Sequence, residues 1–169
     1  MRRERLGSAV LLLLAAAILL RPWEQGWGPG EDEPRSARAL VTRVVDGDTI
    51  EVRFEGGEED VRLIGVDTPE TVEPGAPVQC FGPRASGFSH RLLERRRVRL
   101  VFGVERRDIY GRLLAYVYLG DRFVNAALIR RGLARTLTIP PNDRFASHFK
   151  RLEMRAARGG RGLWGACES

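Results

Sequence analysis

The sequence predicts an α+β fold in which a small five-stranded barrel packs against three helices. Its 169 residues are enough for one compact domain with a short appendage, but too few for two full-sized domains. Three short strand-like segments precede the first helical pattern, two more follow it, and two further helical patterns complete the chain. This order of elements favours a barrel with helices against it.

The predicted strands are short segments rich in β-branched and apolar residues. They cover 39–45, 49–54, 61–66, 98–104 and 112–119. Asp46-Gly47 is a tight-turn signal after the first strand, and Tyr110-Gly111 marks the turn before the fifth. A polar turn over 55–60 separates the second strand from the third.

Each predicted helix combines apolar residues at helical spacing with proline or glycine near its ends. The helices cover about 82–95, about 122–131 and a segment after the Pro140-Pro141 pair. Pro83 lies in the first turn, where its missing N–H is harmless, and Gly132 is a stop signal for the second helix. Asn142 or Asp143 is the expected N-cap of the third helix, and Gly159 marks its end. The whole order fits a five-stranded barrel of the OB type.

Residues 1–21 are arranged like a targeting segment. Three arginines among the first five residues precede an apolar run over 9–20, which is the layout of a secretory signal peptide. The run is shorter than the about 20 residues that span a bilayer, and membrane attachment through 9–20 is the alternative. We therefore expect an exported protein, whether secreted, periplasmic or held at the outer face of the membrane. Residues 22–38 are rich in proline, glycine and acids and are expected to form a flexible linker.

The two cysteines, Cys80 and Cys167, lie far apart and show no metal-binding spacing. In an oxidising compartment they could form one disulfide between the C-terminal tail and the loop before the first helix. Closing so long a loop is worth about 3–5 kcal/mol in the chain-entropy model. Two free thiols are the alternative, and the signal-like segment favours the disulfide.

The positive charge of the chain is carried almost entirely by arginine. The formal net charge is +6, and Lys150 is the only lysine. The guanidinium group binds phosphate through a flat pair of donors, so this composition favours a polyanionic partner. A GC-rich genome, which favours arginine codons, would give the same composition without such a partner.

Three short motifs carry charged residues suited to phosphate chemistry. They are 46–49 (DGDT), 62–70 (RLIGVDTPE) and 108–112 (DIYGR). Each alone also fits a structural role, as a hairpin turn or as a strand that leads into a loop stopped by proline. Their significance therefore lies in the combination.

Taken together, the motifs supply the parts of a phosphodiester hydrolase. Asp48 and Asp67 could share one hard cation, for which calcium is suited because it prefers several oxygen ligands. Glu70 could take a proton from water, and Arg62 and Arg112 could stabilise the charge on the phosphorane.

The sequence resembles the staphylococcal nuclease (thermonuclease) family over about residues 40–164. The matching stretches are VVDGDTI, VRLIGVDTPET, FGPRAS, DIYGRLLAYVY, VNAALIRRGLA and the closing GLW. The resemblance implies an OB-fold domain over 39–166, with three helices packed on the barrel. It also implies a calcium-dependent endonuclease that cleaves DNA and RNA at the 5′-oxygen side and leaves 3′-phosphates. We expect this protein to be a monomer.

The resemblance assigns a role to each matching residue. Asp48 and Asp67 match the calcium carboxylates, and Thr68 matches the residue that offers its backbone carbonyl. Glu70 matches the carboxylate that serves as general base or positions the water. The remaining matches bind substrate: Arg62 and Arg112 correspond to the phosphate-binding arginines, and Tyr110 to a tyrosine near the terminal phosphate of the nucleotide.

Some positions depart from the family pattern. Ile109 stands where the archetype has lysine, and two pocket tyrosines fall at Thr138 and Pro140. Stacking of a base on an aromatic side chain is worth about 1–3 kcal/mol, so we expect weaker or altered nucleotide binding with the chemistry retained.

Two other classes of protein are compatible with parts of the sequence. One is a non-catalytic OB-fold module that only binds nucleic acid, although such modules often lose the acids and arginines that this chain keeps. The other is a cell-envelope interaction domain with a vestigial site, which only the anchor-like N-terminus supports.

Overall fold

The computed structural model describes residues 36–54, 56–71 and 77–167, which lie in one compact unit, Pro34–Ser169. The strands are β1 (Ser36–Val44), β2 (Thr49–Phe54), β3 (Gly57–Leu63), β4 (Val66–Asp67), β5 (Arg97–Arg107), β6 (Leu113–Leu119), β7 (Arg122–Phe123) and β8 (Arg135–Thr136). The helices are α2 (Gly82–Leu93), α3 (Val124–Arg130), α4 (Ala146–Arg158) and the short α5 (Leu163–Ala166). The expected targeting segment, 1–21, lies outside the described residues. Within the described part, no helix is long and apolar enough to cross a membrane.

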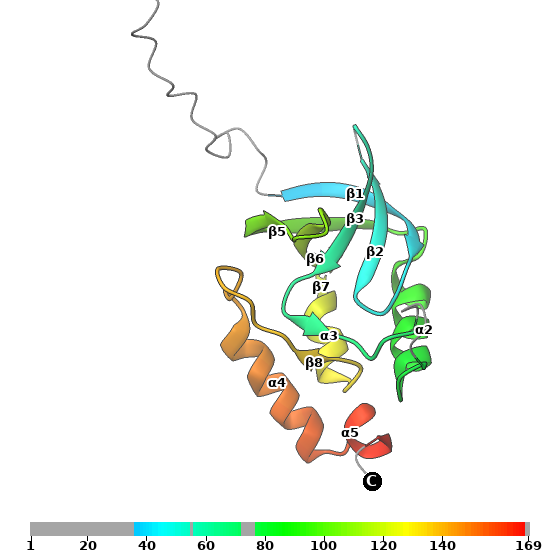
Figure 1. Cartoon of the computed structure of the whole chain (residues 1–169), viewed down its shortest axis with the longest axis vertical. Coiled ribbons are helices and arrows are strands. Elements are labelled where there is room, and N and C mark those ends of the chain that lie inside the picture. The colour runs from blue at the N-terminus through cyan, green and yellow to red at the C-terminus, as the bar shows by residue number, and fades with distance from the viewer. Residues whose placement is uncertain (1–35, 55, 72–76, 168–169) are drawn as a thin grey trace, which may run out of the picture. The chain divides into compact units, whose positions relative to one another are not determined.

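The strands form a closed barrel (Figure 1). The sheet order is β3-β2-β1-β5-β6, with β7 beyond β6, and a parallel pairing of β3 with β6 closes the circle. Closure removes the free edges that an open sheet would present to other chains. The five-stranded barrel with three helices predicted from the sequence is confirmed, and β4 and β8 form a separate small ladder.

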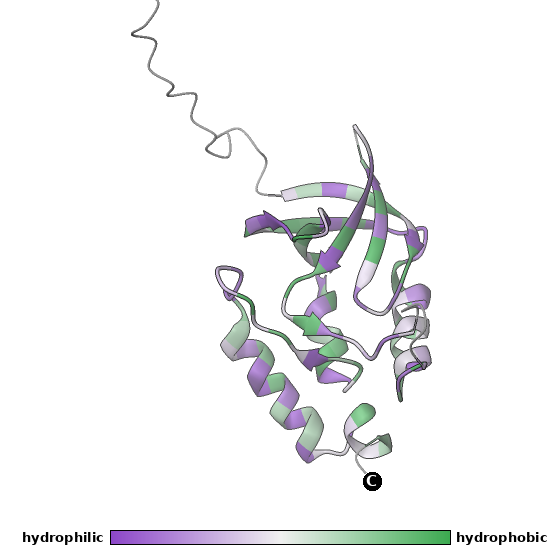
Figure 2. Cartoon of the chain, in the orientation of Figure 1, coloured by the Kyte–Doolittle hydropathy of each residue, from purple (hydrophilic) through white to green (hydrophobic). Residues whose placement is uncertain are grey.

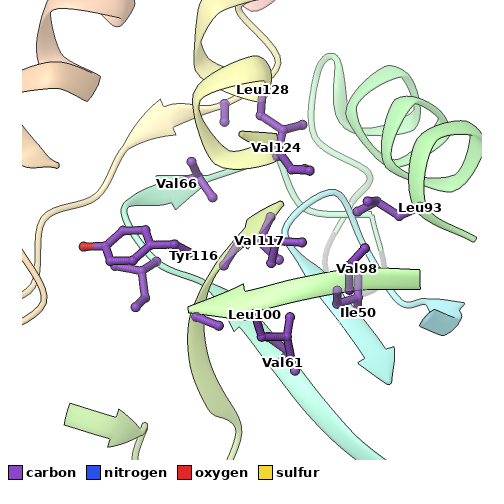
Figure 3. Packing of buried hydrophobic residues seen from close by; sticks show 14 of the residues in the cluster. Ile50, Val61, Val66, Leu93, Val98, Leu100, Tyr116, Val117, Val124 and Leu128 are labelled. Atoms are coloured by element: carbon purple, nitrogen blue, oxygen red, sulfur yellow. The ribbon is translucent and has the colours of Figure 1, made fainter. Parts of the chain in front are cut away.

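Alternating apolar residues of the barrel strands fill its interior. Figure 3 shows Ile50, Val61 and Leu100 grouped inside the barrel, with Val124 and Leu128 of α3 toward the top of the view. All five side chains are buried. Burying a side chain of this size stabilises the fold by about 1.5–3 kcal/mol. The barrel core and the face of α3 thus form one hydrophobic cluster.

Helix α3 lies between the barrel and α4 and is buried over most of its length. Its polar residue Asn125 is fully buried and joins β6 to the residue that follows β3. The Asn125 side chain accepts a hydrogen bond from the Val117 N–H at 2.9 Å and donates one to the Ile64 carbonyl at 2.8 Å. Buried backbone groups need such partners, so Asn125 fixes the chain just after β3, where the site segment begins.

Helix α4 packs through one apolar face, and Figure 2 shows apolar and polar residues interspersed along it. Phe149, Leu152 and Ala156 are buried on this face. The predicted N-cap is wrong, because the helix begins at Ala146 with Phe145 as N-cap. The Asn142 side chain instead forms two hydrogen bonds with the backbone of Glu105 in β5 and is therefore unavailable to the helix.

Several strand boundaries differ from the sequence prediction, including the end of β5 at Arg107. Strand β1 begins at Ser36, inside the segment 22–38 expected to be a linker, because Ser36–Arg38 pair with β5. Strand β3 begins at Gly57, so the polar turn is shorter than 55–60.

A further boundary lies at Gly65, which splits the predicted strand 61–66. Its φ is 79°, and an added Cβ would lie 2.5 Å from the Phe149 ring. A left-handed conformation against a packed aromatic ring favours glycine, which allows the chain to turn sharply after Leu63. Arg62 therefore lies near the end of β3 rather than at the start of a strand.

Replacing Asn125 with leucine should destabilise the fold. Asn125→Leu would leave the Val117 N–H and the Ile64 carbonyl buried without these partners, at a cost of about 2–4 kcal/mol in the free energy of unfolding. Urea unfolding of both proteins measures this difference. A loss of less than 1 kcal/mol would contradict the role given to Asn125.

Candidate active site

The site is organised around Asp48, which lies in the turn between β1 and β2, directly before Thr49. Its backbone carbonyl accepts a hydrogen bond from the Leu63 N–H at 2.9 Å, which ties the turn to the end of β3. Its side chain is buried, and Oδ2 accepts a hydrogen bond from the Thr68 N–H at 2.7 Å. Residues 20 positions apart in the chain are thereby held at one point.

Arg62 joins the two predicted metal carboxylates. Its Nη2 atom lies 3.1 Å from Oδ2 of Asp48 and 3.3 Å from Oδ1 of Asp67. Its Nη1 atom donates to the backbone carbonyls of Leu63 at 3.1 Å and Val66 at 2.7 Å. Four acceptors fix the guanidinium group, so its position follows from the sharp turn after β3.

The environments of the two carboxylates differ. The side chain of Asp48 is 8% exposed, whereas that of Asp67 is 54% exposed. Burial raises the pKa of Asp48, although the Arg62 charge and the Thr68 N–H oppose this shift. The ionised form of Asp48 is therefore costly without additional positive charge.

This donor set fits a hard cation. Nη2 of Arg62 lies within 3.3 Å of both carboxylates, so Asp48 and Asp67 point toward the same positively charged group. Among residues 36–54, 56–71 and 77–167, no three His, Cys, Asp or Glu side chains cluster as a metal site. Calcium also takes backbone carbonyls and water, so two carboxylates with the Thr68 carbonyl remain a compatible set.

Asp46 also belongs to this site, although the sequence predicts only a tight turn at Asp46-Gly47. Its side chain is buried, and Oδ1 accepts hydrogen bonds from the Gly47 N–H and the Thr71 hydroxyl, each at 2.7 Å. Burial, followed by a hydrogen bond to the Glu70 carboxyl, raises the pKa of Asp46 to about 6. The carboxyl groups of Asp46 and Glu70 are thus adjacent. The only sign of this in the sequence is that the DGDT motif carries a second acid besides Asp48.

Glu70 lies outside the regular elements, between β4 and α2, and is partly buried. Its backbone N–H donates to Oε1 of Gln79 at 3.1 Å, and its carbonyl accepts from the Gln79 N–H at 3.0 Å. Glu70 is thereby held next to Asp46, although sequence spacing gives no sign of Gln79.

A cavity of about 340 Å³ opens beside Arg62 and is also lined by Arg112, Tyr110 and Ile109. Arg112 donates through Nε to Oδ2 of Asp108 at 2.7 Å, and its guanidinium carbon lies 5.3 Å from the centre of the Tyr110 ring. Both predicted phosphate-binding arginines therefore face the same cavity.

Two residues of the segment that follows β8 form part of the cavity wall. Leu137 and Ile139 line the cavity, whereas Thr138 and Pro140 do not. Leu137 and Ile139 are 40% and 59% exposed. This part of the wall is therefore aliphatic, and the expectation of weaker nucleotide stacking stays a prediction.

Cys80 and Cys167 form a disulfide, with their Cα atoms 5.9 Å apart. This confirms the predicted pairing. The bond joins the segment before α2 to the residue that follows α5. Cys80 directly follows Gln79, the residue that contacts the backbone of Glu70.

The barrel and its group of acids and arginines define a small OB-type domain with a polar centre at one end of β3. A family profile described as "Staphylococcal nuclease homologue" matches residues 60–166. The chain belongs to this family. The resemblance to this family is thereby confirmed.

Three relatives illustrate the similarity. Thermonuclease of Staphylococcus intermedius is 42% identical over 165 residues, covering 95% of this chain and 98% of that protein. Thermonuclease of Staphylococcus hyicus is 43% identical over 166 residues, with the same coverage. Endonuclease YncB of Bacillus subtilis is 36% identical over 136 residues, covering 79% of this chain and 64% of that protein.

The raised pKa of Asp46 predicts a pH-dependent stability difference. The contribution of protonated Asp46 to the free energy of unfolding is fully present below about pH 3.8, the ordinary pKa of an aspartate. This contribution is lost as the pH rises through about 6, the pKa of Asp46 in the folded protein. Asp46→Asn keeps an uncharged side chain, so the variant should gain stability relative to wild type between pH 4 and pH 7. Allowing for solvent screening, we expect a gain of about 1–2 kcal/mol.

Denaturant unfolding of both proteins across this pH range, with a chelator present, measures the effect. The chelator removes any contribution from cation binding to the neighbouring carboxylates. A wild-type-to-variant difference that stays constant with pH would contradict the assigned burial of Asp46.

Proposed function

We propose that this protein is a calcium-dependent endonuclease that hydrolyses phosphodiester bonds of DNA and RNA. Cleavage at the 5′-oxygen side would leave 3′-phosphates. The observation that carries the proposal is the convergence of Arg62 and Arg112 on one cavity, beside Asp48 and Asp67. The names of the relatives, two thermonucleases and an endonuclease, support the same reaction class.

The carboxylates of Asp48 and Asp67 and the backbone carbonyl of Thr68 would hold the cation. When bound there, calcium supplies positive charge that polarises a phosphate oxygen and makes water a better nucleophile. The buried carboxylate of Asp48 favours a cation because positive charge compensates the loss of solvation.

Glu70 is assigned the role of general base, which takes a proton from the attacking water or positions that water. Its backbone is fixed by Gln79, and its carboxyl group lies next to that of Asp46. A catalytic carboxylate must lie within hydrogen-bond reach of the proton it accepts, so this fixation serves the reaction.

Arg62 and Arg112 are assigned the stabilisation of charge on the phosphorane. Asp108 orients Arg112 through its side chain and accepts the Arg112 backbone N–H at 3.0 Å. Arginines fixed before substrate binds need little rearrangement as charge develops, and one such donor is worth about 100- to 1,000-fold in rate. Tyr110, which is 76% exposed beside Arg112, is positioned to contact the nucleotide.

The proposal extends to location. The signal-like run over 9–20 supports export, either as a secreted or periplasmic protein or one held at the membrane. The disulfide between Cys80 and Cys167 supports an oxidising compartment. Mass spectrometry of the exported protein would distinguish a cleaved signal from a retained anchor.

Replacing Glu70 tests the proposed chemistry. Glu70→Gln removes the proton acceptor but keeps the shape of the side chain, so kcat for single-stranded DNA in calcium should fall at least about 100-fold. The assay is the release of acid-soluble nucleotides by purified protein, with and without a chelator.

The matched control is Glu94→Gln, the same chemical change at the exposed end of α2. This control should retain wild-type activity. Undiminished cleavage by Glu70→Gln, or by wild type in chelator, would overturn the scheme. Binding of DNA without cleavage in calcium would favour the non-catalytic module instead.

A further inference from the structure

We propose that Gln79 is a positioning residue for Glu70, and that the Cys80–Cys167 disulfide holds Gln79 in place. The inference rests on the proposed function, because it assigns a device that sets the geometry of the proposed general base. It is carried by the contacts that Gln79 makes with the backbone of Glu70.

Gln79 contacts both polar groups of the Glu70 backbone. Its N–H donates to the Glu70 carbonyl at 3.0 Å, and its side-chain Oε1 accepts from the Glu70 N–H at 3.1 Å. Such a two-point contact restrains rotation as well as translation of Glu70. We call this pair of hydrogen bonds the Gln79 clasp.

Glu70 requires such a clasp because no regular element holds it. Strand β4 ends at Asp67, and α2 begins only at Gly82. Pro69 has no N–H to offer a ladder. On the far side, the Thr71 hydroxyl is bound to Asp46, so Glu70 lies between two side-chain anchors rather than in a sheet.

The clasp lies against the start of α2. The Gly82 N–H donates to the Gln79 carbonyl at 3.0 Å. A Cβ added at Gly82 would lie 3.0 Å from the carbonyl oxygens of Glu70 and Pro69. The chain before α2 is therefore packed closely on the Glu70 segment.

The disulfide extends this anchor to the C-terminal end of the described chain. Cys80 follows Gln79 directly and is bonded to Cys167, 87 residues away. Helix α5, just before Cys167, is fixed to the end of α3 through a hydrogen bond from the Leu163 N–H to the Gly132 carbonyl at 2.8 Å. A covalent path thus runs from the clasp to an element that is itself packed against the core.

Loss of the clasp should affect the rate of the reaction more than substrate binding. A misplacement of about 1 Å can lower a rate about 100-fold. The proposed nucleotide contacts come from Arg112 and Tyr110, in a segment that the clasp does not touch. We therefore expect a lower kcat with an almost unchanged KM.

The experiment compares five variants of the full-length protein in the calcium-dependent cleavage assay, well below their melting temperatures. Gln79→Met removes the acceptor at similar length, and Gln79→Glu keeps an acceptor oxygen. The double variant Cys80→Ser/Cys167→Ser removes the tether. Val78→Ala, at a residue 59% exposed in the same segment, is the control for a change that leaves the clasp intact.

Gln79→Met should lower kcat about tenfold, with KM within about twofold of wild type. Gln79→Glu should restore most of kcat, and Val78→Ala should match wild type. Cys80→Ser/Cys167→Ser, which lacks the disulfide, should also have a lower kcat than wild type. Adding Gln79→Met to this double variant should lower kcat much less than adding it to wild type, because both changes act on the same clasp.

Full kcat in Gln79→Met beside an active wild type would overturn the inference alone. Equal loss in Gln79→Met and Gln79→Glu would also overturn it, because the acceptor would then not matter. A wild-type protein without calcium-dependent cleavage would overturn the proposed function and this inference with it.

Discussion

The position of one guanidinium group, that of Arg62, determines how the rest of the site is arranged. The chain turns sharply at Gly65, so the carbonyls of Leu63 and Val66 converge on Nη1 of Arg62, while Asp48 contacts Nη2. Arg62 in turn holds Asp67 near Asp48. Two mutually repelling carboxylates remain close because an arginine compensates them, and the same closeness makes them suited to a cation.

This arrangement depends on the closed barrel. The parallel pairing of β3 with β6 fixes the end of β3, and Asn125 of α3 satisfies the Ile64 carbonyl just beyond it. The pairing also brings Arg62 opposite Leu114, so the hairpin that carries Arg112 lies next to Arg62. The barrel therefore brings together motifs that are about 50 residues apart in the chain. Glu70 has a second anchor, the Gln79 clasp.

The motifs point to acids and arginines that lie close together in the structure. Much of the fold could be predicted from the sequence, because β-branched alternation and turn residues are local signals. Three features could not. Asp46 shares the site with Glu70 only through tertiary packing, and its turn role conceals that contact. Asn142 does not cap α4, because its side chain forms hydrogen bonds with the backbone of Glu105 in β5. Leu137 and Ile139, rather than the residues after them, face the cavity, and spacing alone does not determine this register.

The most direct test of the account identifies the ends of the cleaved strands. A short single-stranded DNA oligonucleotide is digested by the purified protein in calcium and, in parallel, in chelator, and the fragments are analysed by mass spectrometry. The account predicts fragments that end in 3′-phosphate and begin with 5′-hydroxyl, formed only in calcium. Fragments with 5′-phosphate ends, or the same fragments in chelator, would contradict the assignment of Asp48, Asp67, Glu70 and the two arginines to one calcium-dependent centre.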